Sequence, residues 1–291
     1  MNMQRIDIKT FKKKVIAILS LVLVLFFSSC EDVVKLDLET GETRIVVDAE
    51  IIWKKGTTGS EQVIKVSKTA PYYNNTTPKV SGAKVKITNS KGDIFIFNEK
   101  EPGFYVCTNF VPVINMDYAL SVEAEGQSFT ATEKLISVTP IDRIEQKLVP
   151  DVGGDDLYEI GFFFKDPIDQ VNFYLTDYKT DVLIFPTYTL LDDELFNGNE
   201  INPRFSDTKL KPGKSVAVIN RGVSKNFYNY MSLLLEIYGG SPFSIPPGNI
   251  RGNIINTTNA NNFAFGYFRL CEADTFTYVV KENDNIVYPS K

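Results

Sequence analysis

Residues 81–133 read SGAKVKITNSKGDIFIFNEKEPGFYVCTNFVPVINMDYALSVEAEGQSFTATE. Apolar and polar residues alternate in short runs along this stretch, and a period of two places one face of a strand in a core and the other in solvent. Ser90-Lys91-Gly92-Asp93 and Ala124-Glu125-Gly126-Gln127 separate such runs and have the composition of hairpin turns, in which glycine supplies a positive φ. The stretch therefore predicts a succession of antiparallel strands.

The same pattern extends to both sides and predicts a first domain over residues 44–137. Seven strands are expected in it, at 44–52, 62–68, 84–89, 94–98, 103–108, 118–124 and 127–133. Short alternating strands in this number commonly bury their apolar faces between two sheets. The run Ser81 to Ile87, with Gly92, Gly103-Phe104-Tyr105 and Tyr118 to Val122, resembles transthyretin-like sandwiches of bacterial surface proteins. A transthyretin-like or immunoglobulin-like β-sandwich is therefore the fold expected here.

Residues 138–291 are expected to form a second, β-rich domain. Val138-Thr139-Pro140-Ile141-Asp142 is interpreted as the connector, because Pro140 disfavours a helix there. Strands are predicted at 157–165, 172–177, 181–190, 215–220, 263–272 and 275–281. A chain of this length more often builds two modest cores than one. The fold class expected for the whole chain is all-β, with one helix in the second domain.

The one predicted helix begins after Ser224, a residue type that caps helix N-termini. Apolar residues then recur at helical spacing, at Phe227, Met231, Leu234 and Tyr238. Gly239-Gly240 provides a C-terminal stop. This apolar stripe is expected to pack against a sheet; the alternative is a surface groove for a partner helix.

The N-terminal residues 1–29 are predicted to be a signal peptide. Basic residues precede the apolar run Val15 to Phe27, which is shorter than the roughly 20 residues that a membrane-spanning helix requires. Phe27-Ser28-Ser29-Cys30 resembles a bacterial lipobox, in which cleavage occurs before a cysteine that carries lipid. Two or three acyl chains, at about 0.8 kcal/mol for each buried methylene, hold a protein firmly on a membrane. Cys30 is therefore the predicted lipid attachment site; a plain signal peptide and an ordinary thiol are the alternative.

Residues 30–43 are expected to form an acidic tether behind the lipid. They contain Glu31, Asp32, Asp37, Glu39 and Glu42. Without residues 1–29 the chain has 26 basic and 35 acidic residues, which is a net charge of −9 instead of −5. Nucleic-acid-binding surfaces need an excess of basic residues. The composition therefore argues against nucleic-acid binding, and the lipid rather than charge is expected to hold the chain at the membrane.

The sequence contains no histidine. Ser-His-Asp and Cys-His catalysis need an imidazole base, and catalytic zinc sites almost always use an imidazole ligand. The sequence also has no GxSxG elbow, glycine-rich phosphate loop, CxxC pair or HExxH helix. We therefore expect a protein that is not an enzyme and holds no cofactor. Cys107 and Cys271 lie in apolar runs and are interpreted as small hydrophobes, with a disulfide between them as the alternative.

Two groups of acids, Asp155-Asp156 and Asp192-Asp193-Glu194, are the remaining candidates for chemistry. Glycoside hydrolysis needs only two carboxyl groups about 5–10 Å apart, so the sequence leaves it open. Asp192 and Asp193 are also weak candidate calcium ligands. Phe196, however, stands where an EF-hand loop requires an oxygen ligand. Neighbouring Gly and Asn residues favour solvated loops for both groups.

One family resemblance spans most of the chain after Cys30. The run from Pro242 to Ile254, followed by Phe265-Gly266-Tyr267-Phe268, resembles the C-terminal signature of a Bacteroidota envelope lipoprotein family catalogued as domain of unknown function 4249. Further segments agree with it: Cys30-Glu31-Asp32, Arg44 to Glu50, Phe164 to Pro167 and Asp192 to Gly198. The resemblance implies a lipoprotein signal, β-rich domains and genes often found near TonB-dependent receptors. It supplies no catalytic residue.

These observations favour a lipid-anchored protein of the outer membrane that faces the cell exterior, because acids after the cysteine resemble a surface-display signal. Its expected role is a non-catalytic binding or accessory subunit of a TonB-dependent-receptor-type transport or assembly machine. The expected partner is an outer-membrane β-barrel protein, and the sequence names no ligand. The alternatives are a structural lipoprotein of envelope assembly and a carboxylate-based glycan hydrolase.

Overall fold

The computed structural model describes residues 41–71, 76–239, 250–282 and 286–289. The predicted signal peptide 1–29, Cys30 and most of the tether 30–43 lie outside the described residues, as does the proline-rich run up to Asn249. Glu42–Lys291 forms one compact unit. No helix in the part that the structure describes is long and apolar enough to cross a membrane.

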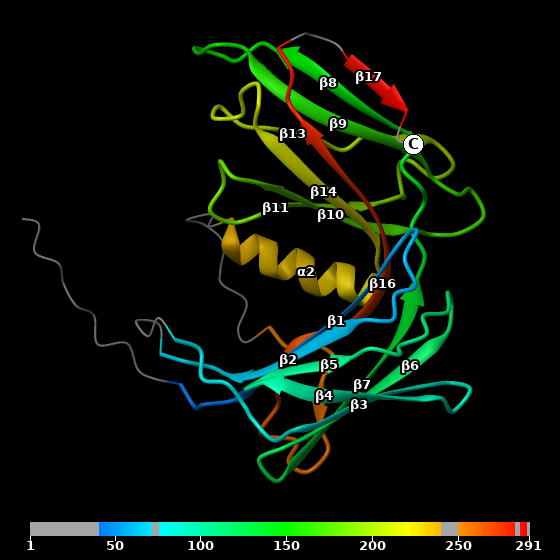
Figure 1. The fold of residues 1–291 in the computed structure, drawn as a ribbon, viewed down its shortest axis with the longest axis vertical. Helices are drawn as coiled ribbons and strands as arrows, with labels where there is room; N and C mark the ends of the chain where they lie inside the picture. Colours follow the sequence, from blue (N-terminus) through cyan, green and yellow to red (C-terminus); the bar gives the residue numbers. More distant parts are fainter. Residues whose placement is uncertain (1–40, 72–75, 240–249, 283–285, 290–291) are drawn as a thin grey trace, which may run out of the picture. The chain divides into compact units, whose positions relative to one another are not determined.

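Eight strands form a closed, barrel-like sheet, which we call the closed sheet (Figure 1). Around the ring it runs β16–β1–β2–β5–β4–β3–β6–β7, and a parallel pairing of β7 with β16 completes it. The strands are β1 (Ile45–Lys54), β2 (Gln62–Lys68), β3 (Lys84–Asn89), β4 (Ile94–Glu101), β5 (Phe104–Cys107), β6 (Asp117–Ala124), β7 (Gln127–Ile136) and β16 (Phe265–Val279).

Alternation of apolar and polar residues explains the closed sheet. Ile87, Val122 and Ile51 are fully buried inside it, whereas Lys84 and Lys86 lie on its exposed outer face. The first core contains the inward-facing residues of every strand in the ring. The all-β prediction with one helix is thus confirmed in its coarser form, a mostly-β chain, and the seven predicted N-terminal strands are present.

The finer prediction of a two-sheet transthyretin-like or immunoglobulin-like sandwich is not confirmed. Strand β16, which comes from the C-terminal region, pairs in parallel with β1. The pairing runs from Val46 opposite Phe265 to Lys54 opposite Ala273. Strand β16 also pairs with β7 at Leu270 and Cys271. These pairings join both ends of the N-terminal strand series into one sheet. A pairing between segments so distant in sequence leaves no local pattern from which it could be predicted.

A second core lies between two sheets that involve the rest of the chain. The first is the continuation of the large sheet through β10 (Phe173–Thr180), β11 (Thr187–Asp192), β14 (Ser215–Gly222) and the C-terminal part of β16. The second contains β8 (Arg143–Val149), β9 (Leu157–Lys165), β12 (Glu200–Ile201), β13 (Arg204–Ser206) and β17 (Ile286–Pro289). The short β15 (Ile255–Asn256) pairs with β7. Phe162, Tyr178 and Val218 are buried in this second core.

The strand β16 contributes to both cores. Phe268 and Leu270 belong to the first core and Tyr278 to the second. The domain boundaries 44–137 and 138–291 stay a prediction. Strand β16 lies in the second range but contributes side chains to both cores. The sequence suggested two strands here, but Ala273 and Asp274 continue the ladder without a break. Strand β8 was not predicted. It begins directly after the proline-containing connector.

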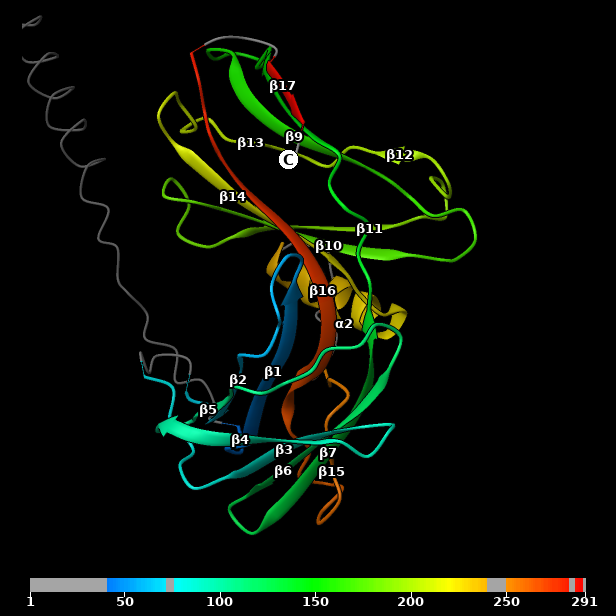
Figure 2. The same ribbon diagram turned by 45° about the vertical axis from the view of Figure 1, so that its right-hand side comes forward.

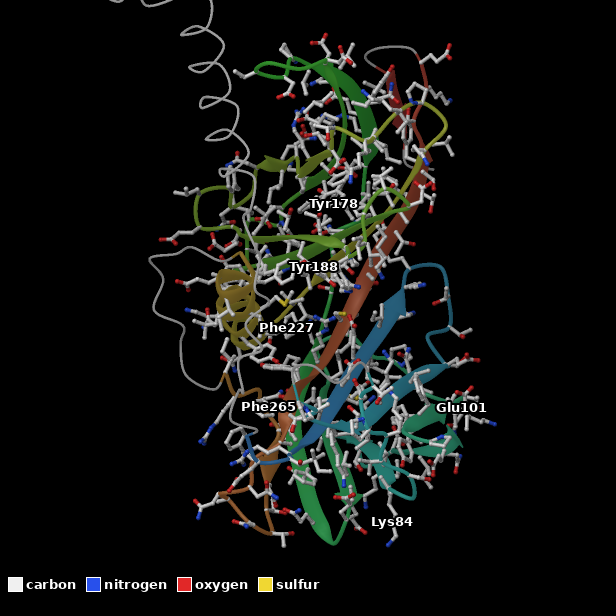
Figure 3. All side chains as sticks on the ribbon, turned by 90° about the vertical axis from the view of Figure 1, so that its left-hand side faces the viewer. Lys84, Glu101, Tyr178, Tyr188, Phe227 and Phe265 are labelled. Carbon is white, nitrogen blue, oxygen red and sulfur yellow. The ribbon has the colours of Figure 1, made fainter. Side chains whose placement is uncertain are left out.

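The predicted helix is present as α2 (Lys225–Tyr238). The Ser224 side chain accepts a hydrogen bond from the backbone N–H of Phe227, and Gly239 follows at the C-terminal end. Phe227 is buried against the sheet with Tyr267, whereas Tyr238 is 74% exposed. The apolar stripe therefore packs on the sheet in its first half only. Figure 3 labels Phe227 on the helix, Tyr178 in the second core and Lys84 on the closed sheet.

Candidate functional site

The predicted acidic candidates lie in two separate turns outside the closed sheet. Asp155 and Asp156 are exposed in the β8–β9 turn. Asp192 ends β11, and Asp193 begins the connection from β11 to β12. This connection lies against the β9–β10 connection, and the two make the best-defined candidate site (Figure 2).

Asp166 ties these two connections together. Its side chain follows β9 and is buried. The Tyr174 hydroxyl donates to Oδ1 of Asp166 at 2.6 Å, and the backbone N–H of Gly198 donates to Oδ2 at 3.1 Å. Burial, and then the hydrogen bond to Asp166, raise the pKa of Tyr174. Because a buried carboxylate must be satisfied by donors, this contact fixes the spacing of the two connections.

Asp193 provides a second set of hydrogen bonds between the same two connections. Its Oδ2 accepts from the backbone N–H of Asn172 at 2.7 Å, and its own N–H donates to the Asn172 carbonyl at 3.2 Å. The Asp193 carbonyl accepts from the N–H groups of Phe196 and Asn197 at 2.8 and 2.7 Å. The segment thereby forms a tight turn that is anchored to the end of the β9–β10 connection, directly before β10.

Gly198 lies where the backbone of one loop contacts the Ile168 side chain of the other. Its φ is +73°, a conformation that side-chain-bearing residues rarely adopt. A Cβ at this position would lie 3.0 Å from Cβ of Ile168. The two connections are therefore interlocked by two carboxylates and one glycine.

Large apolar side chains on these interlocked loops point into solvent. Ile168 and Val171 are each 71% exposed, Leu195 is 83% exposed and Phe196 is 43% exposed. We call these four residues, with the exposed acids Asp169 and Glu194 beside them in sequence, the two-loop surface. Exposed apolar side chains on neighbouring, hydrogen-bonded loops are typical of binding surfaces.

The candidate calcium ligands are engaged by hydrogen-bond donors. Asp193 is bound as described above, and Asp192 accepts from the Tyr228 hydroxyl at 3.1 Å and from the Glu194 N–H at 3.3 Å. Among the residues that the structure describes, no group of three or more Cys, Asp or Glu side chains is arranged to hold a metal ion. A calcium role for Asp192 and Asp193 stays a prediction, and their observed contacts are structural.

A buried charge network lies beside α2. Arg221 forms a two-point contact with Asp177, at 2.6 and 2.9 Å, and its Nε lies 3.2 Å from Oε1 of Glu50. Arg269 also pairs with Glu50 and lies over the Phe227 ring, with its Cζ 4.3 Å from the ring centroid. The two arginines balance the two acids. Each of the four residues comes from a different strand, so their contacts connect β1, β10, β14 and β16.

Opposing effects set the pKa values in this network. Burial raises the pKa of Glu50, but the charges of Arg269 and Arg221 outweigh burial, and the pKa lies below its usual 4.5. Burial raises the pKa of the nearby Cys271 thiol to about 12. At neutral pH Glu50 is therefore ionised, and Cys271 is a protonated, unreactive thiol.

Cys107 and Cys271 are both free and buried in the structure. The Cys107 Sγ lies 3.1 Å from Oδ1 of Asn109, and the Cys271 Sγ lies 3.7 Å from the Ile51 carbonyl oxygen. The interpretation of both as small buried side chains agrees with this arrangement, and the alternative disulfide is not formed.

The sequence placed candidate residues on one of the two loops only. Asp192 and Asp193 were singled out for their charge, whereas Ile168, Val171 and Leu195 were not noticed. A usable signal was present, because large apolar residues stand in segments that are otherwise rich in Asp, Asn, Gly and Pro. Which of them are exposed depends on the pairing of the loops.

Comparison with known proteins identifies the family of this chain. The family model described as domain of unknown function (DUF4249) matches residues 31–277. Among curated proteins no match is found. The match begins next to Cys30 and includes the first core, most of the second core and the two-loop surface. The chain therefore belongs to the DUF4249 family.

Proposed function

We propose that this chain is a lipoprotein of a Bacteroidota-type cell envelope, anchored through Cys30 to the outer membrane and facing the exterior. In this proposal it acts as a non-catalytic binding or accessory subunit of a transport or assembly machine of the TonB-dependent-receptor type. Its partner is an outer-membrane β-barrel protein.

The observation that carries the binding role is the two-loop surface. Four large apolar side chains are exposed there on loops that hydrogen bonds hold in place. Exposing such side chains costs solubility, and a rigid support lowers the entropy that is lost on binding. These two properties together favour a surface that is covered by another molecule.

The anchoring role is supported by the sequence around Cys30. The apolar run Val15 to Phe27 has the length of a signal peptide, and Phe27-Ser28-Ser29-Cys30 resembles a lipobox. The family match starts at residue 31, directly after the proposed lipid attachment site. A protein held at the membrane by lipid is well placed to contact an integral membrane partner.

The proposed non-catalytic role is supported by how the buried acids are used. Asp166 and Asp193 hold loops through hydrogen bonds, and Asp177 and the half-buried Glu50 are neutralised by arginines. Carboxylates that act as acid, base or nucleophile must instead reach a substrate. These four side chains therefore favour a structural use.

A pull-down from detergent-solubilised outer membranes tests the proposal. The tagged full chain should recover one integral outer-membrane protein in near-equal amount, identified by mass spectrometry. The Cys30→Ala variant serves as the control for anchoring, because it should lose recovery from membranes but not its fold. Recovery of the wild-type chain alone, without any membrane protein, would contradict the accessory role.

A further inference from the structure

We infer that the two-loop surface is the docking site for the protein partner, and that this partner presents an apolar patch with basic side chains around it. The inference rests on the proposed accessory function and adds the location and chemistry of the contact. It concerns Ile168, Val171, Leu195 and Phe196 with the acids Asp169 and Glu194.

The first step is that these side chains contribute little to the fold. Leu195 is 83% exposed, and neither it nor Val171 belongs to a buried core. A side chain that remains in solvent gains almost nothing from burial, at about 25 cal/mol per Å² of apolar surface removed from water. Their apolar character is therefore not explained by the stability of the chain.

The second step is that the loops below them are preorganised. The carboxylates of Asp166 and Asp193 each accept a backbone N–H from the opposite loop, at 3.1 and 2.7 Å. Gly198 allows Ile168 to lie directly on the neighbouring backbone. A surface that is already ordered loses little conformational entropy when a partner covers it.

The third step concerns charge. Asp169 and Glu194 are exposed and adjoin the apolar residues in sequence, and Asp192 is half-buried and accepts a hydrogen bond from Tyr228. Lys165 is the exposed basic residue that immediately precedes this surface in sequence. The excess of acids favours a partner with basic side chains at its rim and disfavours a surface of anionic lipid. A protein is therefore the favoured occupant.

The test compares matched pairs of exposed apolar residues in the tagged, full-length chain. Leu195→Ser with Phe196→Ser removes the centre of the two-loop surface. Ile94→Ser with Ile96→Ser is the control, because these residues are 57% and 60% exposed on the outer face of the closed sheet. Both variants should keep the wild-type thermal unfolding temperature, which shows that each still folds.

The Leu195/Phe196 variant should recover about tenfold less partner than the wild type, and the control pair should stay within about twofold. Asp169→Lys with Glu194→Lys should also reduce recovery, and high salt should make this loss smaller. Undiminished recovery by the Leu195/Phe196 variant would overturn the docking site while leaving the accessory role intact. If the wild-type chain recovers no partner, the accessory role itself fails.

A lipid surface is the competing occupant and has its own measurement. The full chain with Cys30→Ser is mixed with vesicles of phosphatidylethanolamine and phosphatidylglycerol, and bound protein is measured by sedimentation. We expect no more binding than with the Leu195/Phe196 variant of the same chain. Vesicle binding that disappears when Leu195 and Phe196 are replaced would assign the surface to lipid and overturn the inference.

Discussion

The closed sheet and the second core bury very different side chains. Inside the closed sheet the interior is almost wholly apolar, with residues such as Val47, Ile87 and Phe129. Around the second core, Gln146 is buried against Tyr278 and Asp166 is buried in the adjoining loops, and Asp177 and Arg221 are buried in the charge network beside α2. Apolar packing therefore dominates inside the closed sheet, whereas outside it buried polar contacts add to an apolar core. Replacing single side chains in each region tests this contrast.

The largest loss of stability is expected for Asp177→Ala. This change removes the two-point partner of the buried Arg221 guanidinium and leaves Glu50 as its neighbouring acid. Removing one partner of a buried ion pair typically costs about 3–5 kcal/mol. Urea unfolding at pH 7 measures the free energy of unfolding. The matched control is Asp48→Ala, which removes an exposed pair with Lys65 in the closed sheet and should cost less than about 1 kcal/mol.

A double replacement sharpens the same point. Asp177→Leu with Arg221→Met removes both charges and should recover most of the stability that Asp177→Ala loses, because apolar residues can replace a buried ion pair. If the double variant is as unstable as Asp177→Ala, packing rather than charge determines the cost.

A smaller loss is expected for Ile87→Ala in the closed sheet. Ile87 is fully buried, and the change removes apolar contacts and leaves a cavity. Such replacements cost about 2–5 kcal/mol, and those at the low end occur where neighbours can relax. The measurement is again urea unfolding. Ile96→Ala, at an exposed position of the neighbouring strand, is the control and should leave the free energy of unfolding nearly unchanged.

The charge network also predicts a dependence on pH. The pKa of Glu50 is lower in the folded chain than its usual 4.5, so ionised Glu50 stabilises the fold at neutral pH. This contribution is present above about pH 4.5 and is lost as the pH falls through the lower, folded pKa. The difference in free energy of unfolding between the wild type and Glu50→Gln should therefore be largest at pH 7 and shrink in acid. A difference that grows on acidification would contradict the assigned direction.

The smallest effect on stability is expected at the two-loop surface. Leu195→Ser with Phe196→Ser should lower the free energy of unfolding by less than Asp177→Ala or Ile87→Ala does, because Leu195 is 83% exposed and Phe196 is 43% exposed. A loss of several kcal/mol would show that these residues belong to a core and would remove the reason to regard them as a binding surface.

The same contrast explains what could be predicted from sequence. The predicted bounds of strand β3, 84–89, agree with the structure, and so does the predicted hairpin turn at Gly92. Both predictions were possible because alternation and turn chemistry are local signals. The Ser224 cap and helix α2 were predicted for the same reason. Local signals do not report which distant segments pair, so the closure of the sheet by β16 was not anticipated.

The candidate site was predicted only in part, for a related reason. Asp192 and Asp193 stood out as acids, but their hydrogen bonds to Tyr228 and Asn172 come from other elements. The buried role of Asp177 could not be seen either, because Arg221 lies in a different strand. Exposure of Leu195 follows from these same tertiary contacts and not from its neighbours in sequence.

We propose that Cys30 anchors this protein to a membrane, where the two-loop surface meets a partner. Membrane fractionation of cells that express the full chain, with intact-mass analysis of the mature N-terminus, tests the proposed anchor. We expect an acylated Cys30 as the first residue, and release of the Cys30→Ala variant from the membrane fraction. An unmodified Cys30, or a Cys30→Ala variant that stays with the membranes, would contradict it.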